Sequence, residues 1–149
     1  MALFSADTAL REPFSLLVEK LLSEEGIKAE DVFFHALESE SDPQMNYWVV
    51  RLLVEKKAVD PCKEVSKDSA GMAVMPIHAA CLLNNTGALA AMLDLGAYEG
   101  SPLGKHYVAA MRICQSQGFD QGAGLMMAHA QEQGVLDALL LSLQGIKPH

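Results

Sequence analysis

Apolar residues recur along this chain at the three- and four-residue spacing that marks one face of an α-helix. Four windows show the spacing most clearly: Phe14, Leu17, Val18 and Leu21; Met45, Trp48, Val49, Leu52 and Leu53; Tyr107, Ala110, Met111 and Cys114; and Leu136, Leu139, Leu140 and Leu143. No convincing run of strand-like alternation is present. The pattern predicts about eight helices, near residues 13–24, 30–39, 44–57, 76–83, 86–95, 105–117, 121–132 and 135–144.

Proline and glycine support these helix ends. Pro13 and Pro76 suit the first position of a helix, where a missing N–H group costs nothing. Four glycines follow apolar runs, where a left-handed residue ends a helix: Gly26, Gly96, Gly118 and Gly145. Most of the predicted helices have about two or three turns and need neighbours to bury their apolar faces. Short helices paired in series favour a stacked, solenoid-like array.

One segment carries a family pattern. From Met75 the chain reads MPIHAACLLNNTGALAAMLDLGA, with Pro76-Ile77-His78 near its start. This segment, residues 75–97, resembles the ankyrin repeat, a helix–turn–helix unit that opens with Thr-Pro-Leu-His. The repeat closes with Leu-Leu-x-x-Gly-Ala, and four residues occupy those places: Met92, Leu93, Gly96 and Ala97. The match runs without a gap, whereas the flanking repeats are degenerate.

The resemblance implies an all-α fold, an ankyrin-like solenoid of about four stacked helix–turn–helix pairs in one domain spanning residues 1–149. It also implies that His78 is a structural histidine that bonds the backbone across the boundary between repeats. Met75 stands where the family has threonine, so a helix cap worth about 1 kcal/mol is lost. The wide spacing between Leu53 and Leu93 predicts an enlarged loop within residues 59–74.

Composition narrows the class of partner. The chain has 149 residues, with 11 basic and 19 acidic side chains and a net charge of −8. A nucleic acid is therefore not expected as the main partner, because phosphate binding needs a basic surface.

Cysteine use and the N-terminus suggest a compartment. The 3 cysteines are far apart, which suits neither a disulfide framework nor a closed zinc site, so a reducing, cytoplasmic location is expected. The N-terminus does not have the pattern of a standard secretory signal. No membrane association is expected, and delivery into a host cell is left open.

These features favour a non-enzymatic protein–protein interaction module. By analogy with ankyrin proteins, the partner would bind to the inter-repeat loops and the concave helical face. The residues expected to project there are Lys67, Asp68, Ser69, Tyr98, Glu99 and Ser101. Tyr98 is the predicted aromatic anchor, and the acidic residues around it would suit a partner with a basic patch. No cofactor, metal ion or catalytic residue is predicted.

Two alternatives from other classes remain. One is an immunity- or chaperone-like helical protein that neutralises its partner by charge. The other is a small enzyme whose site combines Cys62 with distant histidines, since the neighbouring Lys63 could lower the thiol pKa. The sequence GSPLGK at residues 100–105 has the wrong glycine spacing for a phosphate-binding loop. The sequence GFDQGAG at residues 118–124 is interpreted as a connection in which Asp120 caps the next helix.

Overall fold

The described part of the chain is mostly helical. The structure is a computed structural model that describes residues 4–38, 42–67, 69–71, 73–98 and 104–144. A 3-10 helix, η1, spans Thr8–Leu10. The α-helices of the described part are α1 (Arg11–Ser23), α2 (Ala29–Glu38), α3 (Pro43–Glu55), α4 (Pro76–Leu82), α5 (Thr86–Leu95), α6 (Lys105–Gln117), α7 (Asp120–Glu132) and α8 (Leu136–Leu143). The all-α prediction is confirmed, and each predicted helix is present with its ends displaced by no more than about two residues, a usual uncertainty for helix ends.

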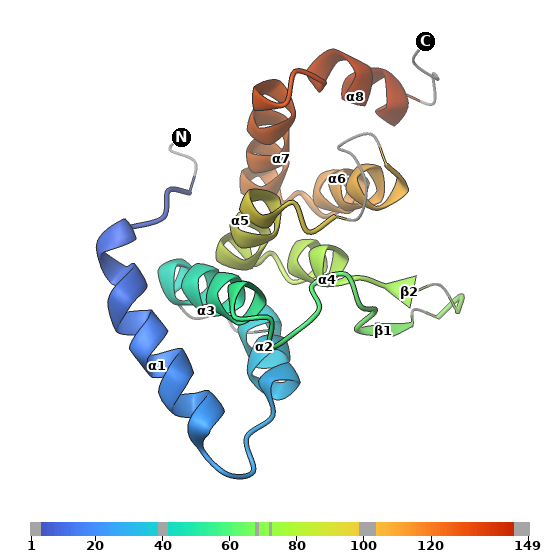
Figure 1. Cartoon of the computed structure of the whole chain (residues 1–149). Helices are drawn as coiled ribbons and strands as arrows, with labels where there is room; N and C mark the ends of the chain where they lie inside the picture. Colours follow the sequence, from blue (N-terminus) through green and yellow to red (C-terminus); the bar gives the residue numbers. More distant parts are fainter. Residues whose placement is uncertain (1–3, 39–41, 68, 72, 99–103, 145–149) are drawn as a thin grey trace.

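The enlarged loop before α4 contains a small β-hairpin. Strands β1 (Ser66–Lys67) and β2 (Ala73–Val74) pair in antiparallel fashion, with Ser66 opposite Val74. Two-residue strands are too short to produce a detectable alternation, so the sequence pattern did not predict them. The hairpin projects away from the helices, next to the start of α4 (Figure 1).

The helices pack in two rows. In the first row α2 contacts α4 and α4 contacts α6, whereas in the second row α3 contacts α5 and α5 contacts α7. The rows are joined pairwise, because α2 packs on α3, α4 on α5 and α6 on α7. At the two ends of this arrangement, α1 packs on α3, and α8 packs on α6 and α7 (Figure 1).

Helix α5 lies at the centre of the second row and is built for close packing. Every residue from Thr86 to Leu93 is buried, and most of these side chains are small. A Cβ atom added to Gly87 would lie 2.1 Å from the carbonyl oxygen of Pro43, the first residue of α3. Only glycine therefore allows the start of α3 to approach α5 this closely.

The buried side chain of Asn85 joins three helices. Its Nδ2 atom donates hydrogen bonds to the carbonyl oxygens of Ala36 (2.8 Å) and Leu37 (2.9 Å), near the end of α2. Its Oδ1 atom accepts from the Ala88 N–H group (3.0 Å), which caps α5, and from Asn46 Nδ2 (3.3 Å) on α3. The ends of a helix leave N–H and carbonyl groups without partners inside the helix. The Asn85 amide supplies partners for such groups at the end of α2 and at the start of α5.

We expect Asn85→Ala to lower the free energy of unfolding by about 2–4 kcal/mol, because it leaves buried backbone groups without partners. Urea unfolding followed by circular dichroism measures the change. The matched control is Asn84→Gly, since the exposed Asn84 has a φ of 54° that glycine adopts freely. The control should change stability by less than about 0.5 kcal/mol. An equal effect of the two substitutions would show that the Asn85 hydrogen bonds contribute little.

Candidate protein-binding groove

An apolar groove lies between α2, the end of α4 and the β-hairpin. We call it the Phe34 groove, and its volume is about 320 Å³. Its lining residues are Phe34, Leu37, Glu38, Val65, Ser66, Lys67, Val74, Ala79, Leu82 and Leu83. The groove is therefore mainly hydrocarbon, with a carboxylate on one side and an ammonium group on the other.

Two leucines at the end of α4 are unusually exposed for their place in the groove. Leu82 is 45% exposed and Leu83 is 47% exposed. Consecutive residues of a helix point about 100° apart, so an adjacent leucine pair cannot bury both side chains in one narrow contact. The pair Leu82-Leu83 in front of a predicted turn is the sequence signal that could have indicated this surface.

A second hollow continues the groove along α2. We call it the Val59 hollow, and its volume is about 500 Å³. Its lining residues are Glu30, Phe33, Phe34, Val54, Lys57, Ala58, Val59, Asp60, Pro61, Lys63 and Glu64. Phe34 lines both hollows, and the α2 residues of the two follow one another along one face of that helix: Glu30, Phe33, Phe34, Leu37 and Glu38. We call the two adjoining hollows the trough, with α2 on one side and the chain from residue 57 to residue 67 on the other.

The predicted binding residues do not all lie on one surface of the structure. Lys67 lies on β1 and lines the Phe34 groove, and Ser69 is exposed just beyond that strand. Asp68, Glu99 and Ser101 lie outside the described residues.

The expectation that Tyr98 projects from a loop is wrong. Its side chain is 8% exposed and packs edge-on against Tyr107 (ring centroids 5.0 Å apart) and His129 (5.5 Å). The chain turns at Gly96, and the Ala97 N–H group bonds back to Met92, so Tyr98 is directed inward. Burying an aromatic ring against other rings is worth more than exposing it to water.

His78 links neighbouring helix pairs, as the resemblance implied. Its Nδ1 atom accepts from the Met75 N–H group (3.4 Å), and its Nε2 atom donates to the carbonyl oxygen of His106 (3.0 Å) on α6. Burial lowers the pKa of His78 from its ordinary value. The neutral imidazole with its proton on Nε2 is the form that makes both bonds. Met75 is the N-cap residue of α4 and is only 8% exposed, so its side chain packs in the core.

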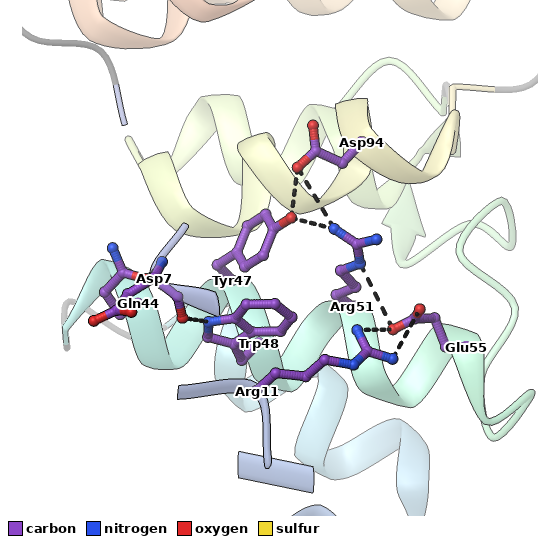
Figure 2. Close-up of polar contacts among 8 residues, drawn as sticks. All are labelled: Asp7, Arg11, Gln44, Tyr47, Trp48, Arg51, Glu55 and Asp94. Carbon is purple, nitrogen blue, oxygen red and sulfur yellow. Dashed lines mark hydrogen bonds and ion pairs between the residues drawn. The ribbon is translucent and has the colours of Figure 1, made fainter. Parts of the chain in front are cut away.

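A polar network on the second row ties α1, α3 and α5 together (Figure 2). Arg51 Nη1 donates to Tyr47 Oη (2.5 Å), and this hydroxyl donates to Asp94 Oδ2 (2.5 Å). Glu55 pairs with Arg11 (3.0 Å) and with Arg51 (3.6 Å). Burial and the bond to Asp94 raise the pKa of Tyr47 to about 12, so its proton is held near neutral pH.

Trp48 sits beneath this network and anchors the N-terminal segment. The guanidinium groups of Arg11 and Arg51 lie 5.6 Å and 5.8 Å from its ring centroid. Its Nε1 atom donates to the carbonyl oxygen of Asp7 (3.1 Å), whose own N–H group bonds to Gln44 Oε1 (2.8 Å) (Figure 2). Two arginines face two carboxylates here, so the network is balanced in charge and serves cohesion between the elements.

The cysteines lie in two different settings. Cys81 on α4 and Cys114 on α6 are fully buried, and the hydrogen bond between their thiols, together with burial, raises the pKa of Cys81. Cys62 is half-buried and lines a narrow hollow with Tyr98 and His106 that holds no water-sized space.

The structure also bears on metal binding, membrane insertion and the two glycine-containing sequence motifs. Within the described ranges, no group of three or more His, Cys, Asp or Glu side chains could hold a metal ion. No helix among those described is long and apolar enough to cross a membrane. Phe119 is the N-cap of α7 and Asp120 is its first residue, so the prediction that Asp120 is the N-cap is wrong by one position. Residues 99–103, which hold most of GSPLGK, are not described.

Comparisons of this chain with family models of known proteins, with curated proteins and with solved structures find no match.

We expect acidification from about pH 7 to about pH 5 to destabilise the protein partly through His78. The folded state holds this imidazole neutral, with a lowered pKa, whereas the unfolded chain takes up the proton near the ordinary value. Stability is therefore present at higher pH and is lost as the pH falls through this range. Urea midpoints at both pH values should differ less for His78→Gln than for the wild type. A steeper loss in the variant would contradict the assignment.

The buried position of Tyr98 leads to a further prediction. Tyr98→Ala should lower the free energy of unfolding by about 3–5 kcal/mol, because it removes a core aromatic side chain. Tyr98→Phe is the control and should cost much less, since it keeps the ring. Thermal unfolding of both variants measures the change in stability. An unchanged melting temperature for the alanine variant would show that Tyr98 is not part of the core.

Proposed function

We propose that this chain is a non-enzymatic protein-binding module that holds a partner protein in the Phe34 groove. The observation that carries the proposal is the groove itself, where Leu82 and Leu83 remain almost half exposed beside the partly buried Phe34. Apolar side chains gathered in one concave place on a surface mark an interaction site more often than scattered ones do.

The helix arrangement supports an ankyrin-like architecture for this module. Helices α2, α4 and α6 contact in series, and so do α3, α5 and α7. The hairpin precedes α4, the helix that begins with the Pro-Ile-His motif. His78 bonds the backbone of the next pair, which is the role that the family pattern assigns to this histidine. Rigid stacked pairs of this kind present their surfaces with little loss of conformational entropy on binding.

The chemistry of the groove favours binding over catalysis. Its titratable lining residues are Glu38 and Lys67, and neither is hydrogen-bonded to a nucleophile in the groove. The alternative of a charge-neutralising helical protein predicts binding through the acidic surface instead of the leucines. The three free cysteines of the chain support a cytoplasmic location.

The test compares two leucine variants as affinity baits in a lysate of the source cells. Leu83→Asp places a charge in the Phe34 groove, and it should reduce capture of the partner at least about tenfold, since anchor residues commonly contribute 2 kcal/mol or more. Leu16→Asp is the matched control, because Leu16 is 61% exposed on α1, far along the chain from the groove. Quantitative mass spectrometry measures the captured protein, and circular dichroism confirms that both variants fold.

Two results would reject this assignment. If the wild type and Leu83→Asp capture equal amounts of the partner, the Phe34 groove does not take part in binding it. Loss of the biological activity in Cys62→Ser, with partner capture unchanged, would instead favour an enzyme that uses this thiol.

A further inference from the structure

The trough has the length of two helical turns. The α2 residues at its ends, Glu30 and Glu38, are eight positions apart, which corresponds to about 12 Å along a helix axis. Apolar anchors at positions i, i+3, i+4 and i+7 of a bound helix span about 10 Å. The lining between the ends is mainly apolar and forms the floor, to which Phe34 contributes in both hollows. A single helix with one apolar face therefore matches the floor in length and in character.

An extended peptide fits this place less well. A peptide that binds as an added strand needs a row of free backbone groups along a sheet edge. Strands β1 and β2 have two residues each and are already paired with each other. The hairpin therefore offers a short edge, and the side chains of the trough must supply the contacts.

The two walls of the trough differ in charge. The α2 wall contributes Glu30 and Glu38, whereas the opposite wall contributes Lys57, Lys63 and Lys67. None of these five side chains forms an ion pair with another described residue.

The opposite wall also carries two acids. Asp60 bonds the Cys62 N–H group (2.9 Å), and Glu64 stands beside the lysines. With three lysines and two acids, the wall keeps a net charge of +1, against −2 from Glu30 and Glu38 on the α2 wall. Residues of opposite sign thus face each other across an apolar floor, in contrast to the second-row network, where opposite charges already pair.

Resting on the proposed function, we propose that the occupant of the trough is an amphipathic α-helix of the partner with one basic flank and one acidic flank. Its apolar face lies on Phe34, Leu82 and Leu83. Its basic flank faces the α2 wall, and its acidic flank faces the lysine wall. Flanking charges of this kind set the orientation of a bound helix and exclude wrong partners, as they do beside the apolar seam of coiled coils.

Three synthetic helical peptides test the proposal. All carry the same leucine face, and their flanks are lysine on one side and glutamate on the other, lysine on both sides, or glutamate on both sides. Fluorescence anisotropy measures the affinity of each peptide. The buffer contains about 0.15 M salt, which screens electrostatic attraction beyond roughly 8 Å. The two-signed peptide should bind the wild-type protein at least about tenfold more tightly than either uniform peptide.

Reversing one wall should change the preference. In the double variant Glu30→Lys with Glu38→Lys both walls are positive, so the peptide with glutamate on both flanks should become the tightest ligand. Thermal unfolding checks that this variant folds. An unchanged order of the three peptides would overturn the inference.

The remaining outcomes separate this inference from the proposed function. The all-lysine peptide could instead bind the wild type most tightly, with Leu83→Asp still weakening its binding. In that case the groove binds helices by net charge, so the inference about two flanks fails while the proposed function stands. If no peptide distinguishes the wild type from Leu83→Asp, the trough does not dock helices and the inference is overturned. Loss of the natural partner on Leu83→Asp would in that case leave the proposed function standing.

Discussion

The four hydrogen bonds of the Asn85 side chain are the constraint on which the helix rows depend. They satisfy two carbonyl groups near the end of α2 and the capped N–H group of α5, and they reach Asn46 on α3. A buried amide with this many partners tolerates little displacement, because each lost bond leaves a polar group without water. The first row and the second row are therefore held in one register at the turn between α4 and α5.

The candidate site follows from this constraint. Helix α2 supplies one wall of the Phe34 groove, and the end of α4 supplies its exposed leucines. The Asn85 bonds hold these two elements together just behind the groove, and the His78 bond to the His106 carbonyl holds α4 to α6. The groove is therefore preformed, and a preformed surface loses less entropy on binding than a flexible one.

Charge is used differently on the two sides of the molecule. On the second row, Arg51 lies between Tyr47, Glu55 and Asp94, and its interactions with these residues hold α3 against α5 (Figure 2). Along the trough, the α2 wall carries Glu30 and Glu38, whereas the opposite wall carries three lysines and two acids. Charges that pair within the chain contribute cohesion, whereas charges separated by an open apolar floor are available to a ligand.

The sequence by itself determined the helices, because a 3.6-residue apolar period, Pro76 and Gly96 act through neighbours along the chain. It also placed the enlarged loop before α4, although the two-residue strands within it left no periodic signal. Exposure was decided only by the tertiary structure. Tyr98 and Leu83 each adjoin a predicted turn, yet Tyr98 is buried by α6 and α7 while Leu83 stays exposed. Whether a side chain is covered depends on elements brought together from far along the chain, and local periodicity carries no information about that contact.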